Sequence, residues 1–127
     1  MKVLVTDTVS EAGVELLRKE KDLQVEVRTG LTREELLDAV ADADGMLTRS
    51  GTPLDAEVLG AAKKLRAVAR AGVGVDNIDL ASASRRGIVV INAPTGNTLA
   101  ATEHTLAMIL SLVRKVPQAW NSVAAGE

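Results

Sequence analysis

Short β-branched runs alternate with helix-like segments over the first 98 residues, and this alternation limits the fold more than any other feature. The strand-like runs lie at residues 2–6, 23–28, 45–48, 65–71 and 87–92. Repeated β-α-β units imply parallel strands joined by right-handed helical crossovers, and apolar runs indicate strands that are buried on both faces. We therefore predict an α/β fold. It contains a flavodoxin-like, five-stranded parallel sheet in the order 2-1-3-4-5, with flanking helices.

The beginnings of three helices are marked by local signals. Two threonines stand three residues before a glutamate, the spacing of a capping box, in which each residue satisfies a backbone N–H of the other. The pairs are Thr8 with Glu11 and Thr32 with Glu35. Pro53 is predicted to occupy the first position of a third helix, where its missing N–H costs nothing.

The last thirty residues differ from the rest. Residues 97–116 predict a long helix, capped by Asn97 or Thr98, with apolar residues round most of its circumference. A helix of this kind is expected to be enclosed, so we expect a homodimer formed through residues 98–116. The chain then stops without a strand or a stop signal, which indicates part of a longer protein. We predict a domain at residues 1–98 and bridging helices at 99–127.

Composition excludes several classes of partner. Fifteen basic and seventeen acidic residues leave a net charge of −2, which favours neither nucleic acid nor an anionic membrane. The chain has no cysteine and one histidine, so we expect no metal site. The amino end reaches Asp7 too early for a signal peptide, and the absence of cysteine is typical of a cytoplasmic protein.

Charged residues follow neighbouring strands of the predicted sheet. Arg49 and Ser50 come after the third strand, and Arg70 ends the fourth. Ligands of open α/β sheets bind outside the carboxyl ends of the strands, and guanidinium groups bind carboxylate or phosphate bidentately. We therefore expect a small anionic substrate at this edge. The alternative for Arg70 is an ion pair with Asp76 or Asp79, and for Arg49 an exposed loop position.

The segment Gly72-Val73-Gly74 has the Gly-x-Gly spacing of a turn that lets backbone N–H groups approach an anion. Asn77 stands where a dinucleotide fingerprint needs its third glycine. The turn therefore favours a carboxylate over a pyrophosphate. A tight turn with no ligand is the alternative.

These residues together resemble the D-isomer-specific 2-hydroxyacid dehydrogenases. The similarity is carried by "RAGVGVDNIDLASASRRGIVVINAPTGNTLAATEHTLAMILSLVRKVPQA", by "LTRSGTPLDAEVL" and by "VLVTDTVSEAGVELL". It is greatest to the members that oxidise 3-phosphoglycerate to 3-phosphohydroxypyruvate with NAD, the first step of serine synthesis. The resemblance implies that residues 1–98 are a substrate-binding domain and that the following helix leads to a cofactor domain.

The resemblance also implies roles for individual residues. Arg49 and Ser50 would border the substrate, and Arg70 would hold its charged groups. The backbone of the Gly72–Gly74 turn, at Val73 and Gly74, would take its carboxylate. Val73 would also approach the nicotinamide of NAD, and Asn97 would line the crevice.

The chain departs from the family pattern in what it lacks. It has neither the glycine-rich dinucleotide fingerprint with its acidic ribose-binding residue nor the catalytic Arg, Glu and His, and most of the NAD contacts belong to the missing domain. No catalytic residue is assigned, and His104, inside the long helix, is interpreted as structural. We expect this chain alone to lack dehydrogenase activity. The alternatives are a sibling enzyme acting on glyoxylate or lactate, and a receiver-like signalling module.

Overall fold

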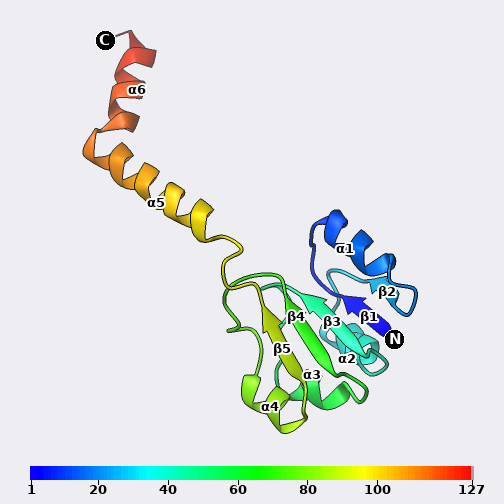
Figure 1. Ribbon diagram of the computed structural model, residues 1–127. Helices are drawn as coiled ribbons and strands as arrows, with labels where there is room; N and C mark the ends of the chain where they lie inside the picture. The colour runs from blue at the N-terminus through cyan, green and yellow to red at the C-terminus, as the bar shows by residue number, and fades with distance from the viewer. Residues whose placement is uncertain (127) are drawn as a thin grey trace. The chain divides into compact units, whose positions relative to one another are not determined.

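The structure, a computed structural model, describes residues 1–126 as two compact units. The first unit runs from Met1 to Gly96, and the second begins at Asn97. The first contains all five strands and four helices, whereas the second consists of two helices (Figure 1).

The first unit contains a five-stranded parallel sheet in the predicted order, β2-β1-β3-β4-β5. The strands are β1 (Lys2–Val5), β2 (Gln24–Val27), β3 (Gly45–Thr48), β4 (Ala67–Arg70) and β5 (Val89–Asn92). The register pairs Thr48 with Arg70 and Arg70 with Asn92. The carboxyl ends of β3, β4 and β5 are therefore level at one edge of the sheet.

One face of the sheet carries the hydrophobic core. The helices of the first unit are α1 (Glu11–Arg18), α2 (Arg33–Val40), α3 (Ala56–Ala61) and α4 (Leu80–Arg85). Leu4, Met46 and Val68, from the three central strands, are at most 3% exposed and lie in one buried cluster with Val40 of α2 and Val58 of α3. Burial of these apolar side chains supplies the main driving force for folding of this unit.

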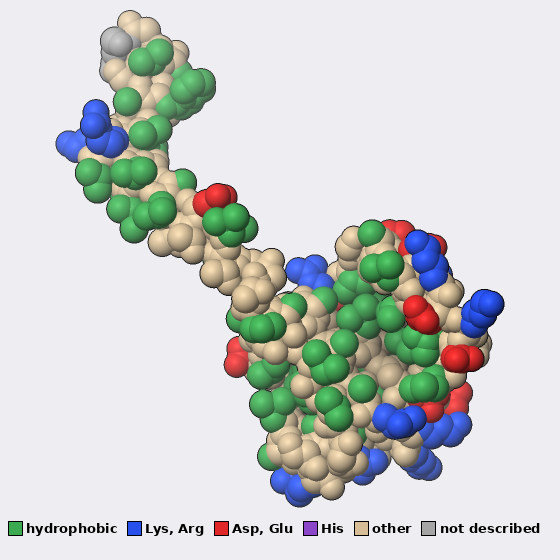
Figure 2. All heavy atoms as spheres, in the orientation of Figure 1, with side chains coloured by type: hydrophobic (Ala, Val, Ile, Leu, Met, Phe, Trp, Pro, Cys, Tyr) green, Lys and Arg blue, Asp and Glu red, His purple; other side chains and the backbone are tan. Residues whose placement is uncertain are grey.

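The other face of the sheet is only partly covered. Its apolar side chains and those of α1 line an open groove of about 970 Å³ that includes Leu16, Leu47 and Ala69. Val89 and Ile91 of β5 are more than half exposed, and Figure 2 shows hydrophobic side chains gathered over this part of the unit. The expectation that the strands are buried on both faces is therefore wrong for this face, because in the described residues only α1 packs there.

The capping box of Thr32 and Glu35 is confirmed at the start of α2. The Thr32 hydroxyl accepts the Glu35 N–H at 3.3 Å, and the Glu35 carboxylate accepts the Thr32 N–H at 2.8 Å. The capping box predicted at Thr8 and Glu11 is wrong, because Glu11 is the first residue of α1 and Ser10 is its N-cap, with no side-chain bond. The carbonyl of Thr8 instead accepts a hydrogen bond from Arg49.

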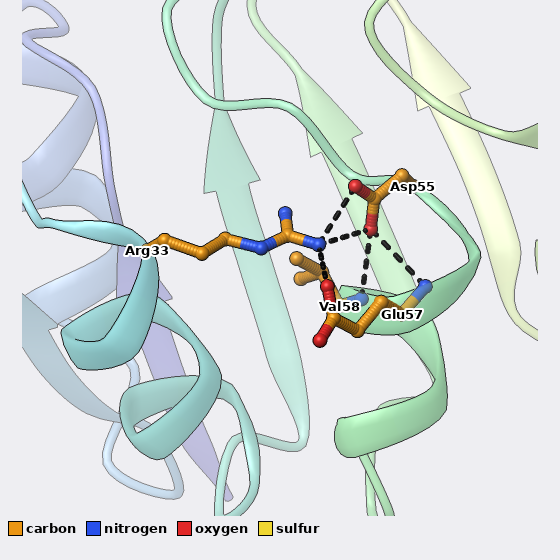
Figure 3. A network of polar contacts seen from close by, with 4 residues as sticks. All are labelled: Arg33, Asp55, Glu57 and Val58. Carbon is orange, nitrogen blue, oxygen red and sulfur yellow. Dashed lines mark hydrogen bonds and ion pairs between the residues drawn. The ribbon is translucent and has the colours of Figure 1, made fainter.

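The third helix begins later than predicted. Asp55 is the N-cap of α3 and accepts the N–H groups of Glu57 and Val58, so Pro53 is not the first helical residue. The reason is that Leu54 is fully buried in a parallel bridge to Ile78, which keeps this segment extended. Asp55 also pairs with Arg33 at the start of α2, as Figure 3 shows. Arg33, then the Val58 N–H, hold the pKa of Asp55 below its ordinary value.

The second unit contains α5 (Thr98–Val113) and α6 (Val116–Ala125). The predicted helix at 97–116 therefore ends three residues early, because Lys115 adopts a left-handed conformation with φ of 52°. Asn97 is the N-cap of α5, but its side chain makes no capping bond. Neither helix has a buried residue. Among the described helices, none has the length and apolar character needed to cross a membrane.

The two threonines that were predicted to cap helices allow a matched test of where α1 and α2 begin. Thr32→Ala removes a capping box and should lower the free energy of unfolding by about 1 kcal/mol. Thr8→Ala should have almost no effect, because the Thr8 side chain caps nothing. Urea denaturation of the two variants measures the difference, and equal losses would contradict the observed helix starts.

Candidate functional site

Polar side chains meet at the carboxyl edge of the sheet. Asp7 follows β1, Arg49 follows β3, Arg70 ends β4 and Asn92 ends β5. The parallel register places these strand ends side by side, and ligands of this class of sheet collect at this edge. The predicted edge thus carries the predicted arginines, together with three side chains to which the sequence analysis assigned no role.

Asp7 is the first of these residues. Its carboxylate accepts hydrogen bonds from the Thr48 hydroxyl at 2.9 Å, the Arg49 N–H at 2.6 Å, and the Thr52 N–H and hydroxyl at 3.2 and 3.1 Å. Burial alone would raise the pKa of Asp7, but these hydrogen bonds, chiefly that from the Arg49 N–H, outweigh it and hold the pKa below its ordinary value. Asp7 is therefore an ionised acceptor that fixes the β3–α3 loop.

Asn77 is the second. Its amide group donates to the carbonyl oxygens of Arg49 and Thr52, each at 2.7 Å. The position that a dinucleotide fingerprint fills with glycine thus carries a side chain that bonds the neighbouring loop. The preference of the turn for a carboxylate over a pyrophosphate stays a prediction.

Asn92 is the third, and it orders the Gly72–Gly74 turn. Its amide donates to the Val73 carbonyl at 2.7 Å, while the Ala93 N–H donates to the Gly72 carbonyl at 3.0 Å. Within the described residues, the N–H groups of Val73 and Gly74 have no intramolecular acceptor. The turn therefore presents two backbone donors at the ligand-binding edge.

Arg70 lies against this turn without an ion-pair partner in the described part of the chain. The alternative pairing with Asp76 or Asp79 is not found. Asp79 instead caps α4, and the hydroxyl and N–H of Ser82 hold the pKa of Asp79 below its ordinary value. The Nε atom of Arg70 is buried and has no hydrogen-bond acceptor in the described residues, which is costly. The charge of this guanidinium is therefore not compensated by any carboxylate in the described part of the chain.

Glycine at position 72 leaves room for this arginine. A Cβ atom added to Gly72 would lie 2.0 Å from Arg70 Nη1 and 2.9 Å from Cζ, so the guanidinium would have to move. Gly72 does not have a positive φ, so the preference for glycine comes from close packing and not from backbone conformation. The glycine turn and the Arg70 guanidinium are therefore packed against each other.

The other predicted residues are placed less tightly. Arg49 and Ser50 are exposed, and the Arg49 guanidinium donates to the Thr8 carbonyl at 3.2 Å, on the side of β1. No contact joins it to Arg70 among the described residues, so their convergence on one anion stays a prediction and requires Arg49 to leave Thr8. Asn97 belongs to the second unit, and its role also stays a prediction.

Residues 3–126 match the model of a family described as D-isomer specific 2-hydroxyacid dehydrogenase, catalytic domain. The chain belongs to this family. Membership of this family excludes the alternative of a receiver-like signalling module. The five-stranded parallel sheet is consistent with the family.

Three relatives illustrate the similarity. D-3-phosphoglycerate dehydrogenase of Archaeoglobus fulgidus is 51% identical over 127 residues, covering 100% of this chain and 24% of that protein. A crystal structure of a protein from Thermus thermophilus has a TM-score of 0.86 at 38% identity, covering 99% of this chain and 41% of its own. The NAD⁺-bound 3-phosphoglycerate dehydrogenase of Entamoeba histolytica has a TM-score of 0.77 at 29% identity, covering 87% of this chain and 38% of its own. The chain thus spans about a quarter of the length of the curated relative.

Adding one methyl group tests the packing of the glycine turn on Arg70. Gly72→Ala should leave the protein folded, because the guanidinium is flexible and can move away, but the ¹⁵Nε resonance of Arg70 should shift. Gly60→Ala is the control, since a Cβ there meets nothing within 4 Å and alanine is the better helix former. An unchanged Arg70 resonance in Gly72→Ala would contradict the contact.

Proposed function

We propose that the chain is the substrate-binding portion of an NAD-dependent D-3-phosphoglycerate dehydrogenase, the enzyme that oxidises 3-phosphoglycerate to 3-phosphohydroxypyruvate in serine synthesis. The observation that carries the proposal is the Arg70 guanidinium, which has no ion-pair partner in the described residues and lies against the glycine turn, whose Val73 and Gly74 N–H groups have no intramolecular acceptor there. The identity of 51% to a D-3-phosphoglycerate dehydrogenase supports this choice of substrate. Residues 1–98 are the proposed substrate-binding domain, in a cytoplasmic enzyme.

The proposed roles follow the geometry of the edge. The Arg70 guanidinium binds an anionic group of 3-phosphoglycerate, and the N–H groups of Val73 and Gly74 bind its carboxylate. Arg49 and Ser50, on the adjacent loop, border the substrate. A charged donor paired with a carboxylate or phosphate in a partly buried site is stronger than the same pair in open water.

Only a small part of the cofactor site is proposed to lie in this chain. NAD is the proposed cofactor, and Val73, which is 39% exposed on the turn, is proposed to approach its nicotinamide end. The turn does not fit the pyrophosphate, because Asn77 replaces the third glycine and its amide is bonded to Arg49 and Thr52. We therefore propose that the rest of NAD is bound outside these 127 residues, by the domain to which α5 and α6 lead, with Asn97 lining the intervening crevice.

A second candidate is another small D-2-hydroxy acid. A D-lactate dehydrogenase of Aquifex aeolicus, solved with NAD and lactic acid, has a TM-score of 0.83 at 26% identity. Lactate carries one anionic group and glyoxylate likewise, whereas 3-phosphoglycerate carries a carboxylate and a phosphate. An edge with two arginines and two free backbone donors favours the substrate with more charge.

Titration of the 127-residue chain with 3-phosphoglycerate, followed by ¹⁵N chemical shifts, tests the function. Binding is the measurement because turnover with NAD is not expected of this chain alone. Arg70→Ala should weaken binding about 10- to 100-fold, since one charge-assisted interaction is lost. Arg66→Ala, at the other end of β4, should bind as the wild type does. Tighter binding of lactate than of 3-phosphoglycerate would favour the second candidate, and no binding of either would refute the proposed site.

We also propose that the second unit forms a homodimer through residues 98–116. Large apolar side chains of α5 are exposed, including Leu106 at 55% and Ile109 at 51%. An apolar surface of this extent on a helix marks an association site.

Sedimentation measurements across a wide concentration range test the dimer. The wild-type chain should associate, and Leu106→Glu with Ile109→Glu should yield a monomer, because buried carboxylates would lose their hydration. Gln118→Glu on α6 is a charge-changing control outside residues 98–116 and should leave association unchanged. A wild-type chain that remains monomeric at every concentration would contradict the proposal.

A further inference from the structure

The loop of residues 49–52 is held from two sides by side chains that come from different loops. Asp7, after β1, accepts the N–H groups of Arg49 and Thr52, and Asn77, before α4, donates to the carbonyl oxygens of the same two residues. At each end of the loop, both the N–H and the carbonyl of the residue are therefore hydrogen-bonded to one of these two side chains. The loop carries Ser50 and the Arg49 side chain at the carboxyl edge of the sheet.

The Asp7 side of this arrangement is closely packed. The carboxylate also accepts the hydroxyls of Thr48 and Thr52, which are 0% and 8% exposed. A Cβ on Gly51 would lie 2.6 Å from Asp7 Oδ1, so only glycine lets the loop close on the carboxylate. With its oxygens bonded to four donors, Asp7 is not available to act on a substrate.

The Asn77 side connects the loop to the segment that contains the glycine turn. The main-chain carbonyl of Asn77 accepts the Leu54 N–H at 2.8 Å, and the Leu54 carbonyl accepts the Asp79 N–H at 2.9 Å. The 49–52 loop and the 70–79 segment are therefore fixed to each other through Asn77. Two segments that are proposed to contact the same substrate cannot move independently while these bonds persist.

We propose that Asp7 and Asn77 are positioning residues that act together as one latch, which holds the 49–52 loop in its substrate-binding conformation beside the glycine turn. This inference rests on the proposed function. The latch does not touch the substrate. It raises affinity by keeping the competent loop conformation populated, since apparent affinity falls in proportion to the competent fraction.

The low pKa of Asp7 is consistent with this role, because the carboxylate then stays ionised and remains the stronger acceptor. A charged side chain of the held loop also lies near Asp7, because the Arg49 guanidinium donates to the carbonyl of the adjacent Thr8. A pH drop through the folded-state pKa of Asp7, which lies below the ordinary value for an aspartate, would protonate the carboxylate and loosen the loop.

Four variants of the chain separate the latch from other roles of Asp7. Asp7→Ala removes every hydrogen bond that the Asp7 side chain makes to the loop. Asp7→Asn removes the charge but retains an oxygen for the backbone N–H groups and an amide that can donate to the Thr52 hydroxyl. Asn77→Ala opens the other side, and the double variant Asp7→Ala/Asn77→Ala opens both. Asp38→Ala is the matched control, because Asp38 is on α2 and its side chain makes no bond in the described residues.

Amide hydrogen exchange measures, with no ligand present, whether the latch protects the N–H groups of the loop. In Asp7→Ala, exchange of the Arg49 and Thr52 N–H groups should accelerate strongly. The Asp44 and Val89 N–H groups, which bond Lys2 and Arg66 at the other end of the sheet, should keep their protection and so report an intact fold. Rapid exchange of the Arg49 and Thr52 N–H groups in the wild type would overturn the latch, whether or not the substrate binds.

Titration with 3-phosphoglycerate then measures its effect on binding. If the competent fraction falls to about a tenth, Asp7→Ala and Asn77→Ala should each weaken binding about tenfold, and Asp7→Asn should stay within about threefold of the wild type. Because the two residues hold one loop, the double variant should lose little more than either single variant, whereas independent effects would multiply to about 100-fold.

The outcomes distinguish the two proposals. Equal losses in Asp7→Asn and Asp7→Ala would show that charge and not position matters, and multiplicative losses in the double variant would show two separate roles. Either result overturns the latch. A wild-type chain that binds no 3-phosphoglycerate while its loop amides are protected refutes the proposed function and leaves the loop held for another purpose, which also overturns the positioning role.

Discussion

The structure depends on the parallel register of β3 and β4, which pairs Thr48 with Arg70. This pairing brings the β3–α3 loop level with the glycine turn, although the two are far apart in the chain. Asp7 reaches the first loop from β1, and Asn92 reaches the turn from β5. A slip of the register by one residue would turn Arg70 and the core residue Val68 to the opposite face, so the site and the core are specified by the same hydrogen-bonded ladder.

At the edge of the sheet, the negatively charged Asp7 and the positively charged Arg70 differ in how far other groups of the protein bond them. The Asp7 carboxylate is fully used by the protein, with four hydrogen bonds that lower its pKa. Arg70 has no internal counter-charge in the described residues, and its Nε is left without an acceptor. Negative charge is thus committed to holding the loop, and positive charge is left for a ligand. This asymmetry, more than the number of arginines, supports the proposed binding of an anion at this edge.

Sequence patterns predicted the parts of the fold that depend on neighbouring residues. Short β-branched runs marked all five strands, and the spacing of Thr32 and Glu35 marked the start of α2, because these signals act within one turn or one strand. The same kind of signal failed at Thr8 and Pro53. There the structure has tertiary contacts that local sequence signals do not report, namely the hydrogen bond from Arg49 to the Thr8 carbonyl and the bridge between Leu54 and Ile78. Arg70 was identifiable because a charge at the end of an apolar strand is conspicuous.

The roles of Asp7 and Asn77 could not be predicted in the same way, because each bonds residues 25 to 45 positions away. An aspartate after a first strand and an asparagine in a loop are ordinary in composition. Their function follows only from the topology, which brings three loops to one edge. The one available signal was negative, since Asn77 broke the glycine fingerprint. A residue that spoils a familiar motif at a ligand-binding edge must be explained by what its side chain bonds, and in this protein it bonds the loop across the site.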